Sequence, residues 1–390
     1  MNERTVLISG AGVGGPALAY WLARHNFRVT VVERAGALRS SGNPVDVRGP
    51  AMDVAARMGI VPRLREAATG NTGLAFVDAA GRRLARVDMP GGRRGEEIEL
   101  PRGDLAAILY DAAREHAEFL FDDSMTAIAQ DAHGVEVTFE RAAPRRFDLV
   151  IGTDGLHSAT RRLAFGEEGG LVRHMGLYVA TTPLGGHRAR ERHEGGDVVM
   201  HNAPGRAVAV SPTPAGDLAF FLYRAPAEPG FDHRDAEQHK RMLAAAFAGV
   251  GWRAPELLER VRAATDLYFD SVSQVRLPRW WTGRVALLGD AASCVSLFGD
   301  GSTLAMAGAY TLAAELAATP ADPQAAFARY ESAHRRLVDP KQANVGRAAA
   351  LMVPATRAGV ATRNLAARAW PLASAVARLR RVPAGRPTPA

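Results

Sequence analysis

The sequence predicts an α/β protein: a discontinuous, Rossmann-like dinucleotide-binding domain, a second domain built on a β-sheet, and a C-terminal helical segment. Three observations predict this class. A G-x-G-x-x-G pattern follows an apolar strand near the N-terminus, two later apolar strands end in Asp-Gly and Gly-Asp, and a β-rich stretch at residues 166–272 separates those two strands. Strands that alternate with helices favour a parallel sheet with helices on its faces.

The N-terminal pattern has the spacing of a dinucleotide-binding turn. Residues 6–8 form an apolar strand, residues 16–24 form a helix, and Gly10, Gly12 and Gly15 lie between them. These glycines permit a tight turn, close approach of the backbone to a pyrophosphate, and close packing of the helix on the strand. The start of the helix offers free N–H groups to the phosphates.

Glu33 closes the following apolar strand at residues 28–32. A carboxylate about 20 residues beyond the glycines accepts hydrogen bonds from the adenosine ribose. Strand, helix, strand and acid together predict dinucleotide binding, but they do not distinguish NAD from FAD.

Two later segments narrow the choice. Residues 147–161 have the pattern of a strand, a tight turn and a helix start, with Asp154-Gly155 at the turn, and residues 284–292 form a buried strand that ends in Gly289-Asp290. A Gly-rich loop at residues 298–303 then leads into a long Ala/Leu helix. With the N-terminal motif, these segments resemble the para-hydroxybenzoate hydroxylase family of FAD-dependent aromatic monooxygenases, and within it the tetracycline-inactivating branch. The resemblance extends to about Arg347.

The resemblance implies a non-covalent FAD and assigns its contacts to the motif residues. The expected FAD-binding residues are Gly10, Gly12, Val13, Gly14, Gly15, Glu33, Arg34, Arg48, Arg102, Asp154, Gly155, Gly289, Asp290, Gly299, Gly301, Ser302 and Thr303.

Four of these side chains have a specific role in the resemblance, and three of them also have an ordinary structural explanation. Arg102 would lie against the pyrophosphate, whose oxygens match a guanidinium, or it is a surface arginine. Asp290 would bind the ribityl hydroxyls. Asp154 would approach FAD, cap a helix, or do both. Arg48 would contact flavin or substrate, or lie on the surface.

The implied reaction uses NADPH or NADH as a transient electron donor. O₂ would add to the reduced flavin, and the C4a-hydroperoxide would hydroxylate or epoxidise a small aromatic or polyketide-like molecule. Residues 293–297 depart from the family, because Ser-Cys-Val-Ser-Leu replaces its usual His and Pro. This departure keeps open an FAD-dependent enzyme that transfers no oxygen, such as a reductase, dehydrogenase or cyclase. An NAD-dependent dehydrogenase or a nucleotide sensor is the other alternative.

The expected domains are discontinuous. The FAD-binding domain would comprise residues 1–72, 99–165 and 273–347, the substrate domain residues 73–98 and 166–272, and the C-terminal helical segment and tail residues 348–390. Residues 74–87 are expected to form a hairpin, and residues 105–118 a helix.

The catalytic residues are not identified by any motif. The candidates are Arg48, His201 and Tyr223, and further candidates for substrate contact are His174, Tyr178, Asn202 and Phe220. A polar residue on a strand can equally face outward. Pro354 and Pro371 are expected to break the basic C-terminal segment into short helices that pack on the protein, rather than one helix that lies on an anionic membrane.

Composition excludes several classes of protein. The chain has 390 residues, a net charge of +7 and one cysteine, Cys294. No concentrated basic stripe precedes residue 347, so nucleic-acid binding is not expected. No apolar run is long enough for stable membrane insertion. His187 and His193 lack metal-ligand spacing. We therefore expect a cytoplasmic monomer or homodimer whose partners are a small-molecule substrate and O₂.

Overall fold

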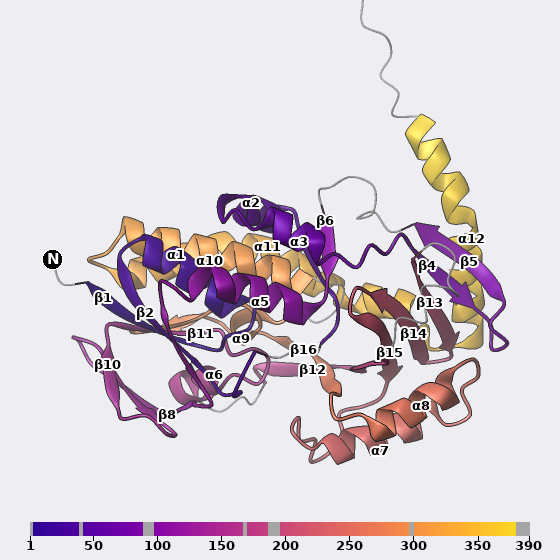
Figure 1. The fold of residues 1–390 in the computed structure, drawn as a ribbon, viewed down its shortest axis with the longest axis horizontal. Coiled ribbons are helices and arrows are strands. Elements are labelled where there is room, and N and C mark those ends of the chain that lie inside the picture. Colours follow the sequence, from indigo (N-terminus) through magenta and orange to yellow (C-terminus); the bar gives the residue numbers. More distant parts are fainter. Residues whose placement is uncertain are drawn as a thin grey trace, which may run out of the picture.

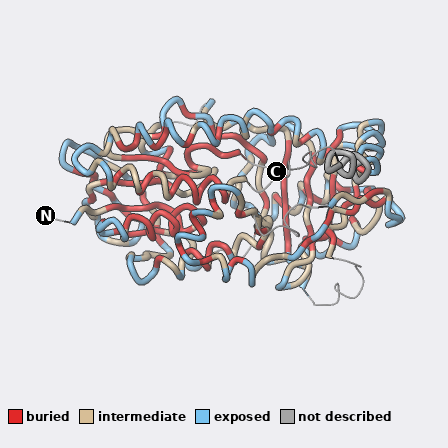
Figure 2. Tube along the Cα trace, turned by 90° about the horizontal axis from the view of Figure 1, so that it is seen from above, coloured by how far each residue is buried: buried red, intermediate tan, exposed pale blue. Residues whose placement is uncertain are grey.

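The computed structural model describes residues 3–38, 42–88, 97–166, 170–185, 196–295 and 300–379, with side chains to residue 369. Two β-sheets lie side by side along the long axis of the molecule (Figure 1). Helices cover both, and buried residues follow the sheets and the inner sides of the helices (Figure 2). The N-terminus lies at one end of this axis and helix α12 at the other.

A six-stranded sheet forms the first half, in the order β17-β18-β11-β1-β2-β7. Its strands are β1 (Arg4–Ser9), β2 (Phe27–Glu33), β7 (Glu118–Phe121), β11 (Leu149–Gly152), β17 (Trp281–Thr282) and β18 (Val285–Leu287). All neighbours are parallel except β17 and β18. The three strands that carry the sequence motifs, β1, β11 and β18, are adjacent, so their carboxyl ends meet at one edge. In doubly wound folds this edge binds ligands.

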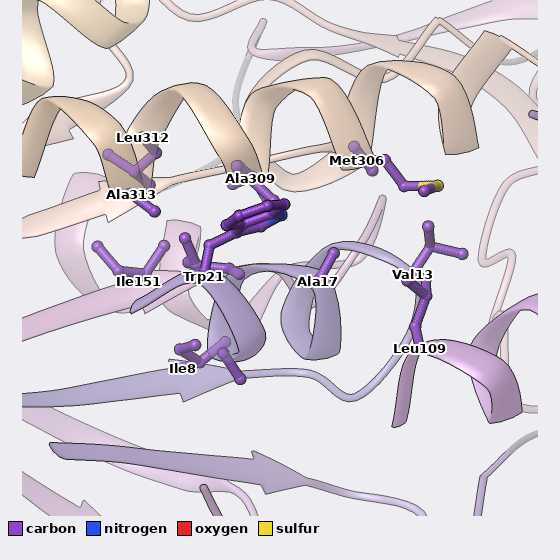
Figure 3. Packing of buried hydrophobic residues seen from close by; sticks show 14 of the residues in the cluster. Ile8, Val13, Ala17, Trp21, Leu109, Ile151, Met306, Ala309, Leu312 and Ala313 are labelled. Atoms are coloured by element: carbon purple, nitrogen blue, oxygen red, sulfur yellow. The ribbon is translucent and has the colours of Figure 1, made fainter. Parts of the chain in front are cut away.

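A group of helices, packed on one another, lies over one face of this sheet. These are α1 (Gly14–Arg24), α2 (Pro50–Arg57), α3 (Val61–Glu66), α5 (Arg102–Ala113), α10 (Asp300–Ala318) and α11 (Pro323–Met352). Helix α10 contacts both α1 and α11, and it is apolar nearly all round, as a fully enclosed helix should be. Trp21 and Ala17 of α1 face α10, whose Ala309 and Met306 lie opposite (Figure 3). This packing fixes where α10 begins.

The other face carries a three-stranded antiparallel sheet of β8 (Met125–Gln130), β9 (Val135–Phe139) and β10 (Arg145–Phe147). Two short helices, α6 (Ala159–Phe165) and α9 (Asp290–Ser293), follow the motif strands, and β3 (Val45–Arg48) pairs with β6 (Glu97–Leu100) beside α10.

A seven-stranded sheet forms the second half, in the order β16-β12-β15-β14-β13-β4-β5. Its strands are β4 (Gly73–Val77), β5 (Arg83–Asp88), β12 (Val172–Pro183), β13 (Asp197–Ala203), β14 (Arg206–Thr213), β15 (Gly216–Arg224) and β16 (Tyr268–Val275). Every pair is antiparallel except β4 with β13.

The alternation of side chains gives this sheet two different faces. On the outer face, Tyr178, Phe221 and Tyr223 pack on helices α7 (Ala236–Phe247) and α8 (Ala254–Ala263). On the inner face, Leu177 and Leu222 belong to a separate apolar cluster that also contains residues of α11 and α12. The sequence predicts this alternation, but not which face meets the helices.

The C-terminal segment crosses the inner face at its far end. Helix α12 (Arg357–Leu379) packs on β5 and β13. The guanidinium of Arg363 lies 3.8 Å from the ring centre of Phe76, and Arg368 Nε donates to Leu84 O at 2.7 Å. The expectation that this segment packs on the protein is met over the described side chains.

Two details of the sequence interpretation were wrong, and one helix was missed. The helix expected at residues 105–118 ends at Ala113, and strand β7 begins at Glu118. Helix α8 was not anticipated. Pro371 does not break the C-terminal segment, because α12 continues through it to Leu379. One proline removes a single backbone donor, and the flanking alanines favour the helix. The hairpin at residues 74–87 is confirmed as β4 and β5.

Candidate functional site

The turn after β1 is built as its glycines predict. Gly10 has a φ of +101°, and a Cβ there would lie 2.9 Å from Thr153 O in the loop after β11. A Cβ on Gly15 would lie 1.9 Å from Gly10 O, so α1 can approach the strand only without a side chain. A Cβ on Gly12, in contrast, would meet nothing within 4 Å. The turn therefore leaves space at Gly12, where a pyrophosphate can approach the backbone.

Helix α1 begins directly after Gly12 and Val13. Val13 occupies the N-cap position and is buried, and no side chain caps the helix, which starts at Gly14. The first N–H groups of a helix have no partner within it. Uncapped, they can bind an anion.

Glu33 is tied to the same turn. Its carboxylate accepts hydrogen bonds from Ala11 N at 2.8 Å and from Ala35 N at 2.9 Å. A carboxylate has about four acceptor positions, so two remain for a ribose. Arg34, which follows, is exposed at the end of β2.

Asp154 caps a helix, as its structural explanation predicted. Its carboxylate accepts from Ser158 Oγ at 2.5 Å and from the backbone N of Thr160 at 2.9 Å in α6. Ser9 Oγ lies 3.4 Å away. Gly155 has a φ of +79° and open space where a Cβ would stand. The backbone of this turn, rather than the Asp154 side chain, is free to face a ligand.

Asp290 begins α9 at the carboxyl edge of the first sheet, and the charge of Arg102 acts on its carboxylate. Gly289, before Asp290, has a φ of +65°, and a Cβ on Gly301 would lie 3.5 Å from Asp290 Oδ1. Burial raises the pKa of Asp290, while the charge of Arg102 and a hydrogen bond with Cys294 oppose that rise. Arg102 makes no hydrogen bond or ion pair to any residue that the structure describes. Asp290 can accept hydrogen bonds from the hydroxyls of a ligand, and Arg102 can bind its phosphates.

Arg48 is engaged with acids at the start of α10. Its Nη2 lies 2.7 Å from Asp300 Oδ1, its Nη1 lies 2.9 Å from Glu97 Oε1, and Lys341 of α11 also contacts Asp300. The hydroxyls of Ser302 and Thr303 donate to the carbonyl of Asp46 at 2.7 and 3.0 Å. These bonds join the start of α10 to β3. Gly299, Ser296 and Leu297 lie outside the described residues.

Asp46 is a titratable group that the sequence interpretation did not select. Burial raises its pKa to about 7, Arg48 lowers it, and the acids Glu97, Glu99 and Asp300 raise it further. Position 46 was visible in the same segment as Arg48, but its acidic neighbours come from distant parts of the chain. A carboxyl group with this pKa can hold or release a proton near neutral pH.

The candidate residues for substrate contact do not lie together in the structure. Tyr178 and Tyr223 lie in the aromatic cluster of the outer face, 5.5 Å apart between ring centres, so they pack rather than face the edge that carries Asp290. Phe220 is on the inner face. His174 bonds the carbonyl of Ala225.

His201 and Asn202 line a cavity of about 180 Å³ between β4, β13 and α12. The ring of His201 bonds Val77 O, and Asn202 binds Met352 O and Arg363. None of the FAD-site residues named above lines this cavity.

Among the described residues, no group of His, Cys, Asp and Glu could hold a metal ion, and His187 and His193 lie outside them. No helix over the described part of the chain is long and apolar enough to cross a membrane.

Comparison with known proteins agrees with this geometry. A family model described as an FAD binding domain matches residues 3–342. An uncharacterized protein of Mycobacterium tuberculosis is 42% identical over 344 residues, covering 87% of this chain and 92% of that protein. A flavin-dependent monooxygenase of an unknown prokaryotic organism is 36% identical, with 88% of each chain covered.

A solved structure supports the same assignment over the whole fold. The crystal structure of tetracycline destructase Tet(51) is similar with a TM-score of 0.81 and 31% identity, covering 98% of this chain and 100% of that one. The glycine turn with space at Gly12 and the partly exposed side chains of Arg102 and Asp290 fit FAD. The chain therefore belongs to the para-hydroxybenzoate hydroxylase family of FAD-dependent monooxygenases, and it is an FAD-dependent oxidoreductase.

Proposed function

We propose that this protein uses NAD(P)H and O₂ to transfer one oxygen atom to a small aromatic or polyketide-like molecule. One observation supports this most strongly. The glycine turn, Asp290 and the start of α10 meet at the carboxyl edge of the first sheet, where Arg102 interacts with Asp290 and helix α9 contacts β16 of the second sheet. Such a junction can hold a cofactor against a substrate.

The FAD contacts follow from that arrangement. Glu33 and Arg34 would hold the adenosine end, Gly12 and Arg102 the pyrophosphate, and Asp290 the ribityl hydroxyls. Bound FAD would supply the redox chemistry, accepting electrons from NAD(P)H and activating O₂. The chain has no second G-x-G-x-x-G, so the nicotinamide would bind transiently.

The protein's own groups would tune this chemistry. The positive end of the α10 dipole would stabilise negative charge on the flavin pyrimidine edge. Asp300 stands at that end, and its charge is balanced by Arg48 and Lys341. The carboxyl of Asp46, which lies beside Arg48 and Asp300, would hold a proton near pH 7.

We also retain the domain division at residues 72/73, 98/99, 165/166, 272/273 and 347/348 as part of the proposal.

The test is a substrate screen with the FAD-loaded protein. Aromatic and polycyclic compounds are added singly, and NAD(P)H oxidation is measured together with product mass. We expect at least one compound to stimulate NAD(P)H oxidation and to gain one oxygen atom. If stimulated NAD(P)H oxidation yields only hydrogen peroxide or a reduced or cyclised product, the chain is the FAD-dependent enzyme without oxygen transfer.

A further inference from the structure

The cavity of about 180 Å³ beside α12 lies far from the candidate FAD site. Residues of β4, β13 and α12 line it, at the end of the molecule opposite to the N-terminus (Figure 1). In the second sheet, β13 is four strands away from β16, the strand that contacts α9 of the FAD-binding half. Since neighbouring strands are about 4.8 Å apart, β13 and β16 are separated by about 20 Å. The cavity is therefore distinct from the candidate FAD site.

Arg363 brings to this cavity a positive charge that no acid balances. Its guanidinium lies 3.8 Å from the ring centre of Phe76, and it donates to Asn202 Oδ1 at 2.7 Å and to Asn364 Oδ1 at 3.0 Å. Its remaining contact is with the carbonyl of Leu351 at 3.5 Å, so all of its acceptors are neutral. No carboxylate among the described residues lies within 4 Å of it. Burial lowers the pKa of Arg363 to about 10, so the side chain remains a cation at neutral pH.

The guanidinium keeps donors for an anionic ligand. A guanidinium has five N–H groups, and a carboxylate can accept from two of them at once. Asp78 is the one acid among the described residues that line the cavity. Its carboxylate is already used, because it accepts from Arg82 Nε at 2.7 Å and from the backbone N of Ala80 and of Arg82 at 2.9 Å. An anion in the cavity would therefore meet an uncompensated cation.

His201 offers a hydrogen-bond acceptor to the same cavity. The residue is 7% exposed, and its Nδ1 lies 3.1 Å from the carbonyl oxygen of Val77. A carbonyl oxygen can only accept, so Nδ1 carries the proton, and Nε2 of the neutral ring is an acceptor. Nε2 makes no hydrogen bond to any residue that the structure describes. This acceptor is available to a ligand that carries a donor.

The rest of the cavity wall is apolar and fits a single ring. Its apolar side chains include Phe76, Val77, Leu84 and Val360. An apolar cavity of about 150 Å³ holds one benzene ring. The cavity beside α12 therefore has space for one ring with a small substituent.

We propose that this cavity is a second binding site, for a single-ring aromatic carboxylate that also carries a hydrogen-bond donor. The carboxylate pairs with Arg363, the ring packs on the apolar wall, and the donor binds His201 Nε2. Because Arg363 belongs to α12 and His201 to β13, the ligand joins the C-terminal segment to the second sheet. Binding at this site requires neither NAD(P)H nor oxygen transfer.

The first test compares benzoate with benzamide, its uncharged analogue. Ligand-detected NMR titration of the full-length, FAD-loaded protein gives both affinities. We expect benzoate to bind with a Kd of about 1 mM or lower. Benzamide should bind at least about tenfold more weakly, because it lacks the charge that pairs with Arg363. Arg363→Gln should weaken benzoate binding by at least about tenfold and leave benzamide binding unchanged.

Arg368→Gln is the matched control. Arg368 also lies on α12 and also joins it to the sheet, through the carbonyl of Leu84, but it does not line the cavity. This variant should bind benzoate as wild type does. An equal loss of benzoate binding in both variants would mean that Arg363 only holds α12 in place, and would overturn the proposal.

The second test addresses the acceptor of His201 with 3- and 4-aminobenzoate, whose amino groups donate hydrogen bonds. At least one of them should bind about tenfold more tightly than benzoate, which corresponds to one hydrogen bond. His201→Phe keeps a ring but no acceptor, so it should remove this gain and leave the affinity for benzoate unchanged.

The outcomes that overturn the proposal are specific. It fails if benzoate does not bind at about 10 mM, which is tenfold above the expected Kd. It also fails if benzamide binds as tightly as benzoate, if Arg363→Gln keeps the wild-type affinity for benzoate, or if neither aminobenzoate binds more tightly than benzoate. Flavin absorbance is recorded in parallel. Benzoate binding that changes this absorbance and is unaffected by Arg363→Gln would place the benzoate site beside the flavin instead.

Discussion

His157 and His233 stack face to face, with ring centroids 3.9 Å apart and planes 7° from parallel. His157 follows the Asp154-Gly155 turn and is also bonded to Asp270, whereas His233 lies between β15 and α7. The stack therefore connects the nucleotide-binding half to a loop of the other half. Burial and the neighbouring His157 lower the pKa of His233 to about 4.

The stack should make stability fall in mild acid. The folded pKa of His233 lies below its unfolded value of 6.5, so the unfolded chain binds the proton more tightly, and stability is lost as pH falls from 6.5 towards 4. His233→Phe keeps a stacked ring that cannot be protonated. Urea unfolding at pH 7 and 4.5 should show that the variant loses less stability than wild type, by on the order of 2 kcal/mol. The exposed His25→Phe should follow wild type, and equal losses in all three proteins would contradict the account.

Two glycines of the same turn should respond differently to alanine. Gly15→Ala places a Cβ 1.9 Å from Gly10 O and should prevent stable folding. Gly12→Ala meets no protein atom within 4 Å, so the FAD-free protein should keep its melting temperature. Its affinity for FAD should fall by at least about tenfold, because the methyl group occupies the approach of the pyrophosphate. Normal FAD binding by Gly12→Ala would place the pyrophosphate elsewhere.

Asp290 and Glu33 should hold opposite ends of FAD. Asp290→Ala removes a charged acceptor, a loss of about 1.5–3 kcal/mol, or roughly 10- to 150-fold in FAD affinity. Asp290→Asn keeps the size and should lose less. Glu33→Ala should weaken FAD binding and also loosen the turn, because Ala11 N and Ala35 N lose their acceptor. Fluorescence titration with FAD gives both affinities. Wild-type values in both alanine variants would show that the motif assignment is wrong.

Asp46 should destabilise the FAD-free protein above neutral pH. Its folded pKa of about 7 exceeds the value of 3.8 for an unperturbed Asp. The folded chain thus binds the proton more tightly, and stability falls as pH rises from 3.8 through 7. Asp46→Asn carries no such charge. Its stability relative to wild type should increase between pH 4 and pH 8 by on the order of 3 kcal/mol in urea unfolding. A difference that stays constant across this range would mean that Asp46 is ionised throughout.

Removal of the chain after Arg347 should destabilise the fold. The truncation removes the carbonyls that accept from Arg224 and the helix that covers Phe76 and Ala85 on the inner face. A lower melting temperature or a lower soluble yield is expected, because apolar surface becomes exposed. A truncated protein with an unchanged melting temperature that has lost only vesicle binding would instead support a membrane-associated segment.

Local features of this chain were predictable, whereas distant pairings were not. Gly10 and Gly15 are close in sequence and form one turn, so their spacing alone predicted the strand, turn and helix. The alternation in β15 predicted two faces, but Tyr223 and Phe220 could be assigned to them only after α7 and α8 were placed. No local pattern in the sequence marks Asp270 or the contact of Lys341 with Asp300. Their partners in the fold lie more than 40 positions away in the sequence.

Oxygen transfer is the central claim, and an isotope experiment tests it most directly. A compound that stimulates NAD(P)H oxidation is converted by the FAD-loaded protein under ¹⁸O₂ in ordinary water, and the product is analysed by mass spectrometry. The account predicts one ¹⁸O atom in each product molecule and one NAD(P)H oxidised for each product formed. A product without ¹⁸O, formed at the same rate as NAD(P)H is oxidised, would contradict it.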